Sequence, residues 1–204
     1  MQSLYPVEVR IIIFLAILCV AIGEPRAQPS VLNNSISSMV KHVHRNGQSF
    51  FEIRAGGFIR ATPQQTWQVL TDYERLPEFV PKLQSSRIIS RNGNETVLDQ
   101  QSTAGIWFAS QTIRLTLLVT EQPYSEIDVK FLAGDMKHFI SRWEIAPAEK
   151  DGVEGTHLVY SGEMEPEFFV PPMIGDVLVE SDVKQMLQAV SVEVVRRESH
   201  ESSR

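Results

Sequence analysis

The chain has 204 residues, of which 43% are hydrophobic and 22% are charged, a balance typical of a globular protein. Its formal net charge of −6 gives no electrostatic support for binding to nucleic acid, which proteins contact through clustered basic side chains. The single cysteine, Cys19, lies in an N-terminal apolar run, so the chain that follows cannot form a disulfide, a thiolate nucleophile or a cysteine-based metal site.

The N-terminus has the features of a secretory signal. Residues 11–22, IIIFLAILCVAI, are uncharged and apolar, but the run is too short for a membrane-spanning helix, which needs about 20 residues. Small residues follow and predict cleavage after Gly23 or after Ala27. We predict a signal peptide over residues 1–27 and a flexible linker over residues 28–37, with export to a bacterial periplasm. An uncleaved N-terminal membrane anchor is the alternative, because Arg10 is the only basic residue before the run.

A β-hairpin is predicted after the linker. Its sequence, VKHVHRNGQSFFEI, has Asn46-Gly47 at the centre, which is the strongest short signal for a two-residue hairpin turn. Such a turn places Lys41 opposite Glu52, so that opposite charges meet across the two strands. The second strand continues through RAGGFIRA, where Gly56-Gly57 predicts a bulge or a sharp bend.

Two short helical segments are predicted next. Thr62 and Gln65 form a capping box around the start of a helix expected over residues 63–73. Pro77 and Pro81 then prevent a long continuation, because proline lacks a backbone donor and restricts the residue before it. We therefore expect a second helical piece of about one to two turns, and we expect both pieces to form a lid over one end of a sheet.

The middle of the chain has the alternating pattern of strands with one apolar and one polar face, which indicates an antiparallel sheet with one solvated side. A second Asn-Gly pair, Asn92-Gly93, predicts a hairpin that pairs Ile88 with Val97. With the strands that follow, this hairpin predicts a meander of about six strands. The later strands are predicted within residues 111–122, 125–133, 138–145 and 156–164.

A long helix is predicted at the C-terminus, opened by Pro171-Pro172 and ending near Arg197. Its apolar residues recur near the helical period, so one side of the helix should be buried. This stripe consists of Ile174, Leu178, Val183, Leu187, Val190 and Val194. We expect the helix to lie across the concave face of the sheet with a space between them, and we expect residues 199–204 to form a disordered tail.

Three segments of the chain resemble one known family. They are TPQQTWQVLTDYERLPEFVPKLQSSRII (residues 62–89), AGDMKHFISRWEI (133–145) and FFVPPMIGDVL (168–178). They are similar to the polyketide cyclase/dehydrase and coenzyme Q-binding START-like proteins of the START/SRPBCC superfamily. The resemblance implies an α+β helix-grip fold over residues 38–198. In this fold a curved antiparallel sheet, two short helices and a long C-terminal helix on the concave face enclose a hydrophobic cavity.

The implied cavity is the candidate functional site. Side chains of the lid, the central strands and the C-terminal helix should converge there, with Tyr73 and Tyr160 as the polar contacts for a ligand. The predicted lining consists of Tyr73, Phe79, Leu115, Leu117, Val129, Phe131, Trp143, Tyr160, Met164, Ile174, Leu178 and Leu187. We expect non-enzymatic binding or transport of a hydrophobic small molecule, namely a ubiquinone-like quinone, a lipid or a polycyclic compound, without a cofactor and with transient membrane contact. Two alternatives stay open, which are a polyketide cyclase/dehydratase-like enzyme that uses the same cavity and an interaction module with a filled core.

The sequence contains no recognised catalytic or metal-binding motif. It lacks a G-x-S-x-G motif, a phosphate-binding loop and a dinucleotide-binding fingerprint. His42 and His44 share one face of a strand, but no third ligand is placed beside them, so we predict no metal site. His138 and His157 are expected on the outward faces of adjacent strands. Asp72 is the remaining candidate for a general acid, although we expect it to bind backbone groups nearby, and we therefore predict no catalytic residue.

Overall fold

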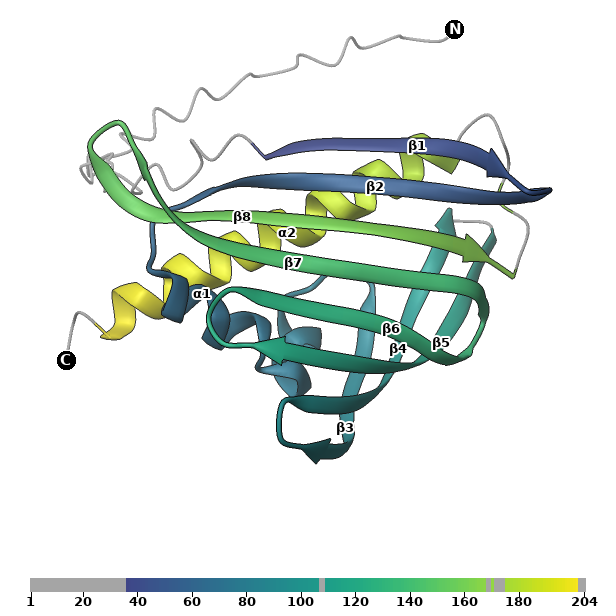
Figure 1. Cartoon of the computed structure of the whole chain (residues 1–204), viewed down its shortest axis with the longest axis horizontal. Helices are drawn as coiled ribbons and strands as arrows, with labels where there is room; N and C mark the ends of the chain where they lie inside the picture. Colours follow the sequence, from purple (N-terminus) through teal and green to yellow (C-terminus); the bar gives the residue numbers. More distant parts are fainter. Residues whose placement is uncertain (1–35, 107–108, 168–169, 171–174, 202–204) are drawn as a thin grey trace, which may run out of the picture. The chain divides into compact units, whose positions relative to one another are not determined.

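The computed structural model describes residues 36–106, 109–167, 170 and 175–201. The predicted signal peptide, most of the linker and Ile174 lie outside the described residues. In chain order (Figure 1), the elements are β1 (Ser37–Arg45), β2 (Gln48–Ile59), α1 (Pro63–Leu70), the 3₁₀ helix η1 (Tyr73–Glu78), β3 (Leu83–Asn92), β4 (Glu95–Ile106), β5 (Ala109–Gln122), β6 (Glu126–Gly134), β7 (Met136–Lys150), β8 (Val153–Pro166) and α2 (Gly175–Glu201). Residues 199–201 are therefore helical rather than part of a tail.

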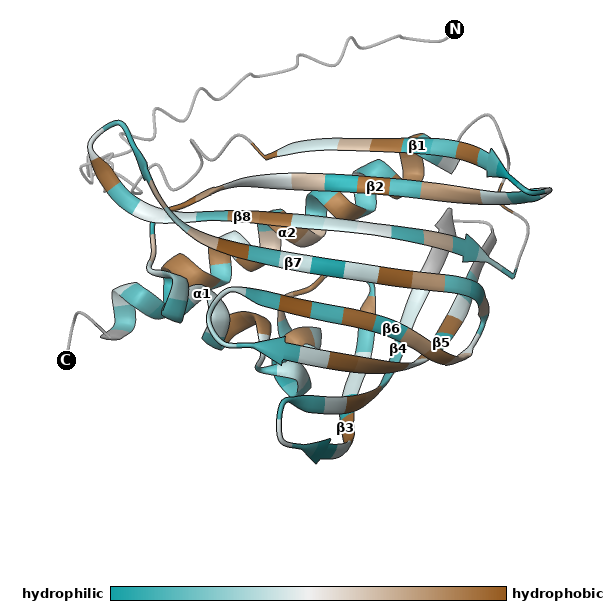
Figure 2. Ribbon diagram, viewed as in Figure 1, coloured by the Kyte–Doolittle hydropathy of each residue, from teal (hydrophilic) through white to brown (hydrophobic). Residues whose placement is uncertain are grey.

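The eight strands of the described residues form one antiparallel sheet in the order β1-β2-β8-β7-β6-β5-β4-β3. The strands β3 to β8 are consecutive neighbours, so the predicted meander is confirmed. Hydrophobic and hydrophilic residues alternate along several strands (Figure 2), and the core clusters of the sheet lie on the face on which α2 packs. The α+β helix-grip architecture predicted from the sequence is therefore confirmed.

The first hairpin has the predicted register. Lys41 lies opposite Glu52, and Asn46-Gly47 forms the turn with positive φ angles of 52° and 78°, as a type I′ turn requires. Of the two alternatives predicted at Gly56-Gly57, a bulge or a sharp bend, the bulge is wrong, because β2 pairs with β8 in one unbroken register through both residues. A Cβ atom on Gly56 would lie 2.7 Å from the carbonyl oxygen of Leu158, so this glycine permits a close approach of the two strands.

The second hairpin differs from the prediction by one residue. Asn92 lies opposite Glu95, so the two residues between them form the turn, and Ile88 lies opposite Leu98 rather than Val97. A register shift in β3, between Ile88 and the turn, accommodates the difference. The shift brings Ile88 and Leu98 into the same core cluster, which a regular ladder from this turn would not do.

The helix α1 begins as predicted and ends early. The backbone N–H of Gln65 donates to the hydroxyl of Thr62 at 3.2 Å, and the backbone N–H of Thr62 donates to the Gln65 side chain at 2.9 Å. The helix stops at Leu70 rather than near Tyr73, and the chain continues as η1, which contains Pro77. The predicted break into two short helical pieces is confirmed.

The helix α2 packs on the sheet through the predicted stripe. Val190 and Val194 join a core cluster with residues of α1, η1 and β4 to β8. Val183 and Leu187 join a second cluster with residues of β2 and β8. Among the described residues, no helix is both long enough and apolar enough to cross a membrane.

Candidate ligand-binding site

We call the face of the sheet that α2 covers the inner face, and it holds most of the predicted cavity residues. Four of these residues are buried in the core clusters, namely Tyr73, Leu117, Tyr160 and Leu187. Seven are only half-buried, namely Phe79, Leu115, Val129, Phe131, Trp143, Met164 and Leu178, and of these Phe131 and Leu178 belong to neither cluster. The sheet and α2 therefore enclose these side chains unequally.

Trp143 marks the centre of the inner face. It lies on β7 between Ile127 of β6 and Tyr160 of β8, which are 2% and 7% exposed. The Trp143 ring packs against both core clusters and lies 4.8 Å from the Tyr160 ring, yet Trp143 remains half-buried. A close-packed core would bury this central tryptophan as fully as its neighbours. Because strands flank Trp143 on both sides, its exposed part lies on the inner side of the sheet.

The polar groups beside Trp143 are hydroxyls. Ser141 lies on the same face of β7, is 7% exposed and forms a hydrogen bond with Tyr160. Burial raises the pKa of Tyr160, and the hydrogen bond with Ser141 offsets part of this effect. The Tyr160 hydroxyl therefore keeps its proton at neutral pH and can form hydrogen bonds without introducing a charge into an apolar site.

Tyr73 is already bound by protein groups. Its hydroxyl donates to the carboxylate of Glu121 at 2.9 Å. Arg91 donates through Nε to the hydroxyl of Thr96 at 3.0 Å, and its guanidinium lies over the Tyr73 ring at 5.8 Å. Burial and the nearby charge of Glu121 raise the pKa of Tyr73. This network ties η1 to three strands. The sequence feature that could have indicated it is Glu121, a charged residue at a position where the alternation of QTIRLTLLVTEQ would place an apolar side chain.

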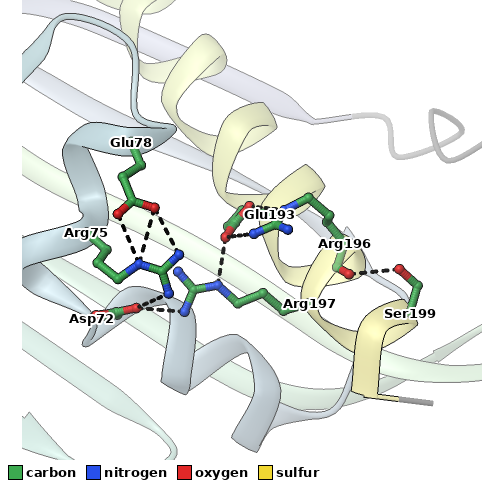
Figure 3. Close-up of polar contacts among 7 residues, drawn as sticks. All are labelled: Asp72, Arg75, Glu78, Glu193, Arg196, Arg197 and Ser199. Carbon is green, nitrogen blue, oxygen red and sulfur yellow. Dashed lines mark hydrogen bonds and ion pairs between the residues drawn. The ribbon is translucent and has the colours of Figure 1, made fainter. Parts of the chain in front are cut away.

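We call residues 71–82 the lid segment, and one end of it is held by the last turns of α2 (Figure 3). Arg197 Nη1 lies 2.8 Å from Asp72 Oδ2, and Arg197 Nε lies 2.7 Å from Glu193 Oε1. Arg196 Nε binds the same Glu193 at 2.7 Å. The hydrogen bonds from both arginines lower the pKa of Glu193 to about 2. Asp72, which the sequence left as a candidate general acid, thus lies in an ion-pair cluster.

The other end of the lid segment contacts the first half of α2. Lys82 forms an ion pair with Asp182, and both side chains are about one-third exposed, at 36% and 38%. Between the two ends, the ring of Phe79 lies 5.9 Å from the guanidinium of Arg197 and packs against the core. The Phe79 side chain therefore extends from the lid segment towards α2 and the core.

The histidines do not form a metal site within the described part of the chain. His42 and His44 contact the hydroxyl of Ser49 at 2.7 and 3.4 Å, and no cluster of three or more metal-ligating side chains occurs among the described residues. His157 is exposed and His138 is half-buried, and both lie on the outward face, as predicted.

An eight-stranded antiparallel sheet gripped by one long helix, with two short helical pieces after the second strand, defines the helix-grip class of the START/SRPBCC superfamily. Residues 59–191 match the family described as "Polyketide cyclase / dehydrase and lipid transport". The chain belongs to this family. No curated protein matches the chain.

Several solved structures share the fold. The STAR-related lipid transfer protein of Xanthomonas axonopodis has a TM-score of 0.60 and 15% identity, and the match covers 78% of this chain and 93% of that chain. The Zhui aromatase/cyclase of Streptomyces sp. R1128 has a TM-score of 0.58 and 17% identity, with 79% and 95% covered. TTHA0849 of Thermus thermophilus has a TM-score of 0.59 and 19% identity, with 72% and 98% covered. At these identities the likeness concerns the fold alone.

Proposed function

We propose that the protein binds a hydrophobic small molecule between the inner face and α2 and carries it without chemical change. The observation on which the proposal rests is the half-buried Trp143 at the centre of the inner face, where six other predicted cavity residues are also half-buried. Apolar surface left accessible in such a place is unfavourable in water, and an apolar ligand that covers it removes this cost. The ligand would enter and leave this site past the lid segment.

The driving force for binding is desolvation. A ligand that buries roughly 300 Å² of apolar surface gains about 7 kcal/mol at ~25 cal/mol per Å², before the cost of ordering it. The hydroxyls of Ser141 and Tyr160 offer hydrogen bonds to a neutral oxygen on the ligand. A ubiquinone-like quinone, a neutral lipid and an oxygenated polycyclic compound all fit this chemistry. The family description includes lipid transport, and one structural neighbour is named as a lipid transfer protein, which supports this reading.

A polyketide cyclase-like activity is the second candidate, and Tyr160 is the residue that favours it. Its hydroxyl stays protonated and could donate to a substrate carbonyl, and another structural neighbour is named as an aromatase/cyclase. Cyclisation also needs a base, and no carboxylate or histidine lies among the described inner-face residues that flank Trp143. Substrate turnover that Tyr160→Phe abolishes and Tyr73→Phe preserves would favour the cyclase over the carrier.

The test uses the tryptophans as reporters of position. One variant keeps Trp143 as its sole tryptophan, and a matched control keeps only Trp67, which is 6% exposed in α1. A brominated long-chain alcohol, which is neutral and quenches indole fluorescence on contact, is titrated into both. We expect saturable quenching of Trp143 and little quenching of Trp67.

Two outcomes of the quenching experiment would contradict the proposal. Quenching of neither tryptophan, or equal and unsaturable quenching of both, would exclude a ligand site at the inner face and favour the filled core. Native mass spectrometry of the purified protein, followed by extraction into organic solvent, then identifies any apolar molecule that co-purifies.

We also propose that the carrier is exported. The motivation is the uncharged apolar run at residues 11–22, followed by small residues. The protein isolated from the periplasm should begin at Glu24 or Gln28 when its N-terminus is sequenced. An intact Met1 found only in the membrane fraction would instead support the uncleaved anchor.

A further inference from the structure

A second concave site lies on the outward face of the sheet. It is a hollow of ≈ 570 Å³ that crosses strands β1, β2, β8, β7 and β6, and we call it the outer hollow. Its lining consists of Met39, Lys41, Glu52, Ile53, Arg54, Asp128, Val129, Lys130, Ile140, Ser141, Arg142, Ser161, Gly162 and Glu163. Its volume lies within the range of about 300–1,000 Å³ that small-molecule sites occupy.

Each carboxylate of the outer hollow forms an ion pair with an arginine. Glu52 and Glu163 share Arg45, which forms an ion pair with each of them. Asp128 accepts two hydrogen bonds from Arg142, at 2.7 and 2.8 Å. The acidic side chains of the lining are therefore paired with arginines.

Three cations of the outer hollow lack such partners. Among the described residues, neither Lys41, Arg54 nor Lys130 forms an ion pair. The lining holds four cationic side chains against three carboxylates, and the flanking Arg45 and Glu126 cancel each other, so its formal charge is +1 and it can accept an anion. Arg54 lies opposite Ser161 on β8, so a planar guanidinium and a hydroxyl stand side by side, which is a donor set that suits a carboxylate or a phosphate.

Exposed apolar side chains accompany two of these cations. Met39 is 48% exposed and lies opposite Arg54 across the β1–β2 ladder. Ile140 is 41% exposed and lies opposite Lys130 across the β6–β7 ladder. Side chains opposite each other on adjacent strands are about 5 Å apart at Cβ, so each apolar group adjoins a cation. The lining thus combines positive charge with apolar surface at two places.

We propose that the outer hollow binds one molecule of a single-chain anionic amphiphile, with its carboxylate or phosphate headgroup on the cations and its alkyl chain along Met39 or Ile140. A concave site accommodates a single molecule, whereas a flat bilayer surface would leave the hollow unfilled. This site is separate from the inner face, because the lining side chains that carry the argument point to the opposite side of the sheet from Trp143.

The experiment uses the full mature protein with its inner face first saturated by the neutral brominated alcohol, because a neutral ester would otherwise bind there. Decanoate, decyl phosphate and methyl decanoate are then titrated below their aggregation concentrations, with calorimetry as the readout. Decanoate or decyl phosphate should bind, whichever headgroup is preferred, and the uncharged ester should bind at least tenfold more weakly. Arg54→Gln should weaken binding about tenfold, because a charge-assisted hydrogen bond is lost. Its matched control is Arg60→Gln, since Arg60 is also exposed and without an ion pair among the described residues but lies outside this hollow.

A second pair of variants tests the apolar part of the site. Ile140→Ser should weaken binding, and Ile89→Ser, which changes an equally apolar residue that is 59% exposed on β3, should not. Equal binding of the ester, equal effects of the Arg54 and Arg60 changes, or binding only to anionic vesicles would overturn the proposal. Decanoate that displaces the neutral brominated probe from Trp143 would also overturn it and would leave the inner-face proposal standing.

Discussion

The ion pairs between the lid segment and α2 should contribute to the free energy of unfolding, and the burial of their side chains sets the magnitude of that contribution. In Arg197→Gln, Asp72 loses its 2.8 Å partner, and Glu193, whose side chain is 8% exposed, keeps only Arg196. Removing one partner of a fully buried pair typically costs ~3–5 kcal/mol. Here Arg197 is 21% exposed and Arg196 still binds Glu193 through two hydrogen bonds, so we expect a smaller loss of about 2 kcal/mol.

Thermal and urea denaturation followed by circular dichroism measure this loss. For a chain of 204 residues, about 2 kcal/mol corresponds to a fall in Tm of roughly 4–8 °C. The matched control is Arg87→Gln, because Arg87 pairs with Asp99 at 2.8 Å but its side chain is 71% exposed. An exposed pair of this kind contributes less than about 1 kcal/mol, so the control should change Tm by little.

A double-mutant cycle isolates the contact with the lid segment. Asp72→Asn and Arg197→Gln should show a coupling of about 1 kcal/mol, because the two side chains share one direct ion pair. Equal losses in Arg197→Gln and Arg87→Gln, or the absence of coupling with Asp72→Asn, would show that the lid segment does not depend on this contact.

Three further predictions concern single groups. The depressed pKa of Glu193, about 2 against an ordinary 4.5, contributes stability above pH 4.5 that is lost as the pH falls towards 2, and Glu193→Gln should flatten urea-unfolding profiles over this range. Tyr73→Phe should cost about 1.5–3 kcal/mol in denaturation experiments, because it removes a buried hydrogen bond to the charged Glu121, and an unchanged midpoint would contradict this. Asp182→Asn should accelerate stopped-flow release of the brominated alcohol without lowering Tm, since its pair with Lys82 is exposed, and an unchanged release rate would exclude that role.

The two hairpins show how far local sequence determines register. Both contain Asn-Gly, but only Asn46-Gly47 occupies the turn as predicted. The second hairpin is constrained on its far side, because β4 pairs with β5 in an unbroken register along its whole length. Leu98 is only 2% exposed, and a shift within β3 lets Ile88 reach it. The burial of Leu98 against the neighbouring strand thus overrides the local turn signal. No pattern within the hairpin sequence encodes this constraint.

The parts of the candidate site that could be predicted are those whose orientation follows from the period of a helix or a strand. The stripe of α2 and the alternation of β5 to β8 place Leu187, Trp143 and Tyr160 on facing surfaces, and the structure agrees. The polar contacts were not predictable in the same way. Asp72 and Arg197 are 125 residues apart in the chain, and their pairing depends on where α2 ends relative to η1. Tyr73 was expected to contact a ligand, but its hydroxyl has a protein partner.

The unequal exposure of the two ion pairs indicates which end of the lid segment would separate from α2 more easily. Near Asp72, the ion pair with Arg197 of α2 joins side chains that are 30% and 21% exposed, and Tyr73 is bound to the sheet through Glu121. Near Lys82, the ion pair with Asp182 of α2 joins side chains that are 36% and 38% exposed. Water screens the more exposed pair at Lys82 more strongly than the pair at Asp72, and Tyr73 holds only the Asp72 end to the sheet, so the Lys82 end separates from α2 at lower cost. A ligand bound beside Trp143 would therefore leave past Lys82, with the Asp72 end as the hinge.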